Sequence, residues 1–104
     1  MRDVCPTDVV RASTERVWHL ITTPGELERW TRTTLIEAPD RQVRAGDRLV
    51  FGGIGRRMKI LFLVQGSVRL QRLAIDVHLP FGIINHEVIE ITAVTADACR
   101  VTFN

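Results

Sequence analysis

The sequence predicts an α+β domain in which two short helices precede a long antiparallel arrangement of strands. Three observations support this class. Residues 13–30 place apolar side chains at helical spacing. From Thr33 onward, most segments alternate apolar and polar residues, as half-buried strands do. Short groups of turn residues separate these segments, which is typical of strands joined as hairpins.

Length and composition indicate one ordinary globular domain. The 104 residues suffice for a single domain, residues 1–104, and 45% of them are hydrophobic and 25% charged. A net charge of +2 predicts no strong attraction to nucleic acid or to a membrane, because such partners usually leave a dense basic patch. The first ten residues contain no apolar signal core, and no apolar run approaches the about 20 residues of a membrane helix. We therefore expect no membrane span and a cytoplasmic location.

The N-terminal elements follow from local signals. Residues 3–12 are interpreted as a first strand, weakened at Pro6 because proline cannot complete a ladder of hydrogen bonds. Ser13 is a favourable N-cap for a helix that ends near Thr22 or Thr23. Its apolar side chains share one face of that helix: Val17, Leu20 and Ile21.

A second, shorter helix follows at once. Thr23 is a suitable cap, Pro24 fits the first helical position, and Glu26 stands where a capping box needs it. Leu27 and Trp30 form its apolar side. Two short helices joined at a Thr-Pro corner are therefore expected.

The remaining chain predicts six strands, near residues 33–38, 46–52, 57–65, 68–79, 83–94 and 99–104. Turn signals separate them at Pro39-Asp40, residues 52–55, Gly66-Ser67, residues 80–82 and residues 96–98. These turns imply that Leu49 pairs with Ile60, Phe62 with Gln71, Leu73 with Ile89, and Ile91 with Phe103.

Paired residues share a face, so the expected register defines two faces. The apolar face holds Leu49, Phe51, Met58, Ile60, Phe62, Leu73, Ile75, Val77, Leu79, Ile89, Ile91, Val101 and Phe103. The opposite face holds Arg48, Lys59, Arg72, Asp76, His78, Glu90, Thr92 and Arg100. Agreement across four turns makes the sheet the best-supported part of the prediction.

Three polar residues fall on the expected apolar face: Gln71, Asn85 and Glu87. A buried carboxylate is costly unless it is paired or hydrated. Asn85 and Glu87 therefore either lie near the turn at 80–82, where water reaches them, or serve as polar groups in a ligand pocket. If this turn has one residue fewer or more than expected, the strand slips by one residue, and His86, Val88 and Glu90 face inward instead.

No residue pattern predicts a metal, a cofactor or a catalytic constellation. His19, His78 and His86 have no metal-ligand spacing and no nearby nucleophile. Cys5 and Cys99 lie far apart in the sequence and are interpreted as two reduced thiols.

The chain resembles the SRPBCC, or START-like, superfamily, which includes polyketide cyclase/dehydrase-like and lipid-transfer proteins. The residues that carry this resemblance are "ASTERVWHLITTPGELERW" at 12–30, Gly46-Asp47, "LPFG" at 79–82 and "CRVTF" at 99–103. It covers nearly the whole chain and is specific for the fold rather than for an activity.

The resemblance implies a helix-grip fold, in which a curved antiparallel sheet wraps a long C-terminal helix around an apolar cavity. The sequence ends where that helix should begin, so we expect a C-terminally truncated domain or a cover supplied by another chain. An uncovered apolar face favours association. We therefore expect a dimer or other assembly that buries Phe51, Phe62, Val101 and Phe103.

The expected function is non-enzymatic binding of a small hydrophobic molecule, such as a lipid or polyketide, on the concave face. The candidate lining is Trp30, Phe51, Phe62, Gln71, Leu73, Ile75, Val77, Asn85 and Glu87. One alternative is a cyclase/dehydratase-type enzyme in which Glu87 is the general acid or base, with its pKa raised by the apolar wall. Another is a protein-interaction module, similar to the chaperone-activating branch of the superfamily.

Overall fold

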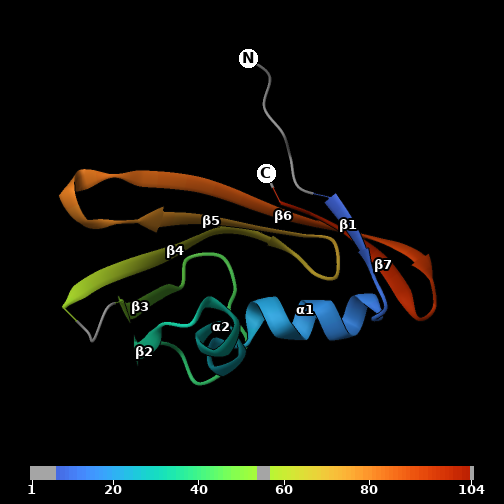
Figure 1. Ribbon diagram of the computed structural model, residues 1–104, viewed down its shortest axis with the longest axis horizontal. Coiled ribbons are helices and arrows are strands. Elements are labelled where there is room, and N and C mark those ends of the chain that lie inside the picture. Colours follow the sequence, from blue (N-terminus) through green and yellow to red (C-terminus); the bar gives the residue numbers. More distant parts are fainter. Residues whose placement is uncertain (1–6, 54–56, 104) are drawn as a thin grey trace, which may run out of the picture.

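The computed structural model describes residues 7–53 and 57–103, and in these residues two helices lie on one side of a seven-stranded antiparallel sheet (Figure 1). The elements are β1 (Thr7–Val10), α1 (Thr14–Thr22), α2 (Pro24–Thr31), β2 (Thr34–Glu37), β3 (Arg48–Gly53), β4 (Met58–Val68), β5 (Arg72–His78), a single 3-10 turn η1 (Pro80–Gly82), β6 (Ile84–Thr95) and β7 (Ala98–Phe103). The long C-terminal helix of the helix-grip fold is not among these elements. Cys5, Pro6, part of the turn predicted at 52–55, and Asn104 lie outside the described residues.

The sheet has the order β1-β7-β6-β5-β4-β3-β2. β2 to β7 form a meander, and β1 joins β7 so that Val10 lies opposite Cys99. We call the sheet face toward α1 and α2 the inner face and the opposite one the outer face. The inner face carries the buried side chains of Leu49, Phe51, Val64, Leu73, Ile75, Ile91 and Cys99.

In β3–β4, and in β6–β7 as far as Ala93, the observed registers differ from the expected ones by two residues. Leu49 pairs with Phe62 instead of Ile60, and Ile91 pairs with Val101 instead of Phe103. The β5–β6 register is as expected, with Leu73 opposite Ile89. Because side chains alternate with a period of two, these even shifts leave the paired residues on their predicted face. The division into faces therefore survives errors in the turns.

The turn predicted at Gly66-Ser67 is wrong, because β4 continues through both residues. The chain reverses at 69–71 instead, where Leu70 adopts φ 65° and the backbone N–H of Gln71 donates to the Val68 carbonyl at 2.9 Å. Gly66 stands beside a bulge, since Val64 pairs with Ile75 and Gly66 with Ala74. A glycine can mark either a bulge within a strand or a turn, so Gly66 by itself does not distinguish the two.

The predicted cap of α1 is confirmed, whereas the predicted capping box of α2 is wrong. The Ser13 hydroxyl accepts a hydrogen bond from the Arg16 backbone N–H at 3.1 Å. The Thr23 side chain makes no cap bond to α2 and instead lies 3.3 Å from His19 Nδ1. Glu26, expected to close the box, pairs with Arg29 at 3.2 Å.

The core lies between the inner face and the two helices. Leu27, Leu49, Phe51, Leu73 and Cys99 are at most 1% exposed. Burial raises the pKa of the Cys99 thiol, because the thiolate would lose its hydration. Neither helix of the described chain combines the length and hydrophobicity needed to cross a membrane.

Candidate functional site: an apolar groove beside the helices

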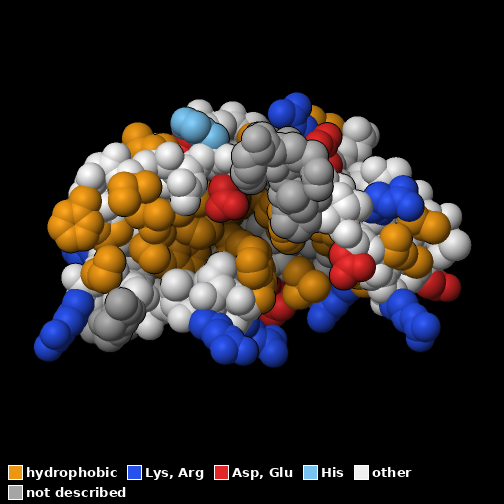
Figure 2. Space-filling view, turned by 45° about the horizontal axis from the view of Figure 1, so that its top comes forward, with side chains coloured by type: hydrophobic (Ala, Val, Ile, Leu, Met, Phe, Trp, Pro, Cys, Tyr) orange, Lys and Arg blue, Asp and Glu red, His pale blue; other side chains and the backbone are white. Residues whose placement is uncertain are grey.

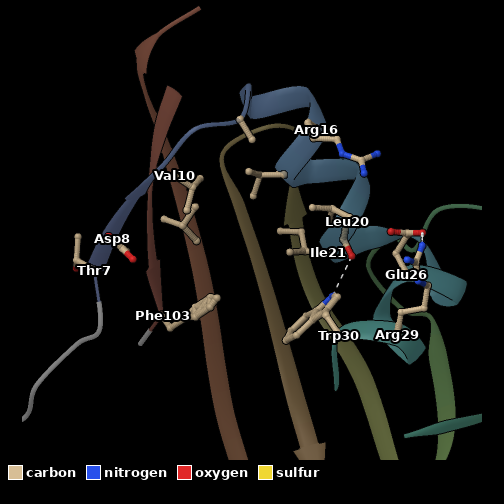
Figure 3. Close-up of a pocket in the computed structure, with 13 residues that line it drawn as sticks. Thr7, Asp8, Val10, Arg16, Leu20, Ile21, Glu26, Arg29, Trp30 and Phe103 are labelled. Carbon is tan, nitrogen blue, oxygen red and sulfur yellow. Dashed lines mark hydrogen bonds and ion pairs between the residues drawn. The ribbon is translucent and has the colours of Figure 1, made fainter. Parts of the chain in front are cut away.

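An open groove of about 910 Å³ separates α1 and α2 from β1 and β7 (Figure 3). Hydrophobic side chains from four elements and one connection make up most of its wall: Val10, Ala12, Val17, Leu20, Ile21, Trp30, Val101 and Phe103. Thr7, Asp8, Arg16, Glu26 and Arg29 complete the lining. We refer to this site as the groove.

The helix wall of the groove follows from the amphipathic pattern of α1. Val17 and Ile21 are buried, while Leu20 is half-buried on the same side of the helix. Spacing of three and four residues brings these side chains onto one face. The sequence identified this face, although only the folded chain shows that part of it lines a groove.

Trp30 forms a fixed part of the wall near the end of α2. Its indole Nε1–H donates to the Leu20 carbonyl at 3.1 Å. That carbonyl lies four residues before Pro24, which has no N–H to complete the helical bond. The indole therefore satisfies an orphan acceptor, and its ring is held in place with 48% of the residue still exposed.

Phe103 faces Trp30 from the opposite side of the groove. It lies on β7, is 36% exposed and pairs with Ile89 in the sheet. Figure 3 shows the Phe103 and Trp30 rings directed into the same space, with Val10 on the β1 side. Residues from both ends of the chain therefore meet across one apolar recess.

Charges are confined to a few side chains around the groove. Arg29 Nη1 and Glu26 Oε1 pair at 3.2 Å on α2, and the Arg29 side chain is 78% exposed. Arg16 and Asp8 are exposed on α1 and β1. The chemistry of this wall suits an apolar molecule whose polar end reaches toward solvent.

Of the nine lining residues proposed from the sequence, Trp30 is the one that lines the groove. Phe51, Leu73, Ile75 and Val77 lie in the buried core behind it. Phe62 is partly buried, and its ring centroid lies 4.7 Å from that of Phe51.

The three polar residues expected on the apolar face are all exposed. Gln71 lies in the β4–β5 turn, where its carbonyl accepts from the Ile91 backbone N–H at 2.8 Å. Asn85 and Glu87 lie on β6 opposite Val77 and Ile75. Glu87 therefore points to the inner-face side, near the end of the sheet rather than in the groove.

Sequence reasoning did not assign Val10, Ala12, Arg16 or Leu20 to a binding site. Val10 and Ala12 belong to a short segment whose only signal was weak alternation. Their role depends on β1 pairing with β7, a contact between opposite ends of the chain. Local pattern contains no information about such a contact.

Metal binding has no support from side-chain positions in the described ranges. In residues 7–53 and 57–103, no three His, Cys, Asp or Glu side chains gather as a possible metal site. His86 Nδ1 lies 2.6 Å from Asp76 Oδ1 on the outer face, with the histidine side chain 76% exposed. This pair joins two neighbouring strands away from the groove.

Solved structures share this architecture at low sequence identity. The chain is similar to DynU16, a protein of the dynemicin biosynthetic locus, with a TM-score of 0.73, 19% identity, and coverage of 96% of this chain and 35% of that one. It is also similar to CalU16 from Micromonospora echinospora, with a TM-score of 0.72, 14% identity, and coverage of 95% and 56%. This chain therefore spans about one third and about half of these two proteins.

A third similar structure is the Aha1 dimer from Colwellia psychrerythraea, with a TM-score of 0.73, 13% identity, and coverage of 100% of this chain and 76% of that one. No protein-family model matches the sequence, and no curated protein matches it. The structural similarities show that the chain shares the helix-grip fold of these proteins, without the long C-terminal helix in the described residues.

Proposed function

We propose that this protein binds a small hydrophobic molecule, such as a lipid or an aromatic polyketide, in the groove. The observation that carries the proposal is an open recess of about 910 Å³ with a mainly apolar wall. Binding sites for small molecules have this size and character. The helix-grip fold supports the same function, although fold alone does not establish it.

Trp30 and Phe103 are the two residues on which binding depends most. Both rings are partly exposed in the groove, and an apolar ligand would remove that surface from water. Trp30 is also fixed by its bond to the Leu20 carbonyl, so little side-chain freedom is lost when a ligand binds.

Native mass spectrometry and a fluorescence titration test this proposal. The probes are palmitate, an anthraquinone and anilinonaphthalene sulfonate, each titrated into the folded protein. Trp30→Ala should weaken binding about tenfold, because it removes one aromatic wall of the groove. Trp30→Phe loses the same hydrogen bond but keeps an aromatic ring, and should lose less.

Ile36→Ala is the matched control, because Ile36 is 41% exposed on β2 and does not line the groove. It should bind the probes as the unaltered chain does. Near-UV circular dichroism verifies that each variant is packed before titration. Retention of none of the three probes, or equal affinity of Trp30→Ala and the unaltered protein, would contradict the proposal.

We also propose self-association through the surface formed by Trp30 and Phe103. These residues leave apolar area exposed along the groove, and contiguous apolar area often marks an interface. The similar Aha1 structure from Colwellia psychrerythraea is a dimer. The cytoplasmic location expected from the sequence stays a prediction.

A further inference from the structure

The β5–β6 hairpin ends in an exposed hydrophobic segment. Residues 79–84 read Leu-Pro-Phe-Gly-Ile-Ile and contain no charged side chain. Phe81 is 94% exposed, Ile83 51% and Ile84 46%. We call residues 79–84 the apolar tip. In Figure 1 it lies at the end of the sheet far from α1, β1 and β7, the same end at which β4 begins.

The backbone of the apolar tip is unusual for a bulky residue. Phe81 adopts φ 68° and ψ 24°, and Gly82 follows with φ 75°. The Leu79 backbone N–H donates to the Ile83 carbonyl at 2.8 Å and closes the hairpin. Turns with two positive φ values favour Asn, Asp or Gly, since other side chains crowd the backbone there.

Phe81 gains almost no packing in return for this unfavourable conformation, because nearly all of its surface is exposed. A strained residue that its own fold does not use is a reason to look for a role outside the monomer. Phe81 protrudes at the end of a hairpin, and this shape suits insertion into an apolar layer. A site that receives a side chain of a partner would instead be a recess.

Basic side chains accompany the apolar tip. Leu61 pairs with His78, so Lys59, two residues earlier on β4, lies level with the turn at 80–82. Arg57 immediately precedes β4 at the same end of the sheet, and both basic side chains belong to exposed residues. Figure 2 shows Lys and Arg side chains at the left margin, next to hydrophobic side chains.

Acidic groups near the apolar tip oppose this charge only in part. Asp76 on β5 lies within 2.6 Å of His86 Nδ1. Glu87 lies on β6 toward the inner face, opposite Ile75 and beyond His86 from the tip. An apolar wedge beside exposed cations matches a surface with anionic headgroups over an apolar interior.

We propose that the apolar tip inserts into the interfacial layer of an anionic lipid bilayer, with Arg57 and Lys59 contacting the headgroups. The net charge of +2 is small, so the attraction is local to this end of the molecule. This membrane contact does not depend on ligand binding in the groove. Its failure and the failure of the proposed function can therefore be told apart.

Flotation with lipid vesicles tests the proposal. The probes are vesicles of phosphatidylcholine alone and of phosphatidylcholine mixed with phosphatidylglycerol. The unaltered protein should float with the mixed vesicles and less with the neutral ones, and added salt should reduce binding. Phe81→Asp should lower the fraction bound about tenfold or more, because a charge replaces the inserted ring.

Val94→Asp is the matched control. Val94 is 49% exposed on β6, and ten residues of strand place it about 33 Å from Ile84. This variant adds the same charge at a half-exposed position far from the apolar tip. It should bind vesicles as the unaltered protein does.

Phe81→Gly separates loss of binding from loss of structure. Glycine adopts the positive φ of this position readily, so the hairpin should keep its fold while losing the wedge. A double variant, Arg57→Glu with Lys59→Glu, should remove the preference for anionic vesicles.

Three results would overturn the proposal. The first is absence of vesicle binding by the unaltered protein. The second is unchanged binding by both Phe81→Asp and Phe81→Gly, which would leave only electrostatic adsorption. The third is a change of oligomeric state in the Phe81 variants with vesicle binding intact, which would assign the apolar tip to a contact between copies of this chain.

Discussion

The structural role of a single residue in this protein depends on the partners that the fold brings close to it. Asp47 shows this in the connection between β2 and β3. Its carboxylate accepts two hydrogen bonds from the Arg41 guanidinium, at 2.6 and 3.0 Å, and a third from the Arg44 backbone N–H at 2.8 Å. The Asp47 backbone carbonyl also accepts from the Val64 N–H at 2.9 Å. Asp47 thus ties the connection to β4.

The bond from Arg41 lowers the pKa of Asp47 below its ordinary value, and the Arg44 N–H adds to that effect. A lowered pKa in the folded state means that the stabilisation is present above the unfolded pKa, near 4, and is lost as pH falls through the folded value. We expect the urea midpoint of the unaltered chain to fall as the pH drops below about 4.

Asp47→Asn should lower the urea midpoint at pH 7 and make it less dependent on pH in the acid range. Asp97→Asn, at an exposed turn position, is the control. Chemical denaturation at a series of pH values measures both effects. An identical acid dependence in Asp47→Asn and the unaltered protein would assign the transition to other carboxylates.

At the scale of elements, side chains link the helices to the sheet. Glu28 on α2 accepts a hydrogen bond from the Leu35 backbone N–H on β2, at 2.6 Å. This link passes over the end of α2, where Arg32 adopts φ 58°. β2 has four residues and pairs with β3 alone, so it depends on such contacts more than a central strand does.

Glu28→Gln should weaken this link, and Glu28→Ala should remove it. A hydrogen bond to a charged group contributes roughly 1.5–3 kcal/mol, so we expect Glu28→Ala to destabilise the protein by about 1–2 kcal/mol. Amide hydrogen exchange should accelerate at Leu35 more than at Leu73 in the centre of the sheet. Equal protection of Leu35 in both variants and in the unaltered protein would show that β2 does not need Glu28.

For the molecule as a whole, the groove is the apolar surface that stays accessible to a ligand or to a second copy. Phe51 is fully buried within this chain, so its predicted place in a dimer interface is wrong: the chain's own core already removes that ring from water. Trp30 and Phe103 keep about half and about a third of their surface exposed. These two residues, rather than Phe51, are available to a second copy or to a ligand.

Light scattering across a range of concentrations measures the self-association proposed above. We expect a dimer whose population rises with concentration and falls in Phe103→Glu, because a charge on the groove wall would be desolvated in the interface. Val94→Glu is the control, at an exposed site away from the groove. A monomer at all concentrations, or an unchanged dimer in Phe103→Glu, would contradict self-association through this surface.

The sequence by itself determined the class, the succession of elements and the faces of the sheet. Alternation with a period of two encodes which side chains face inward, and an even error in register preserves that division. The Ser13 cap and the apolar face of α1 were equally readable, because both depend on neighbours within four residues. Turn positions were less secure, since Gly66 serves a bulge where a turn was expected.

Only the tertiary structure decided where an apolar surface stays open. Val10, Trp30 and Phe103 meet across the groove because β1 pairs with β7 and α2 folds back beside α1. Such contacts join segments distant in the chain, and local pattern does not specify which of them form. The same pattern that marked Leu73 and Phe103 as inward-facing could not show that one becomes core and the other remains accessible, because burial depends on what lies opposite.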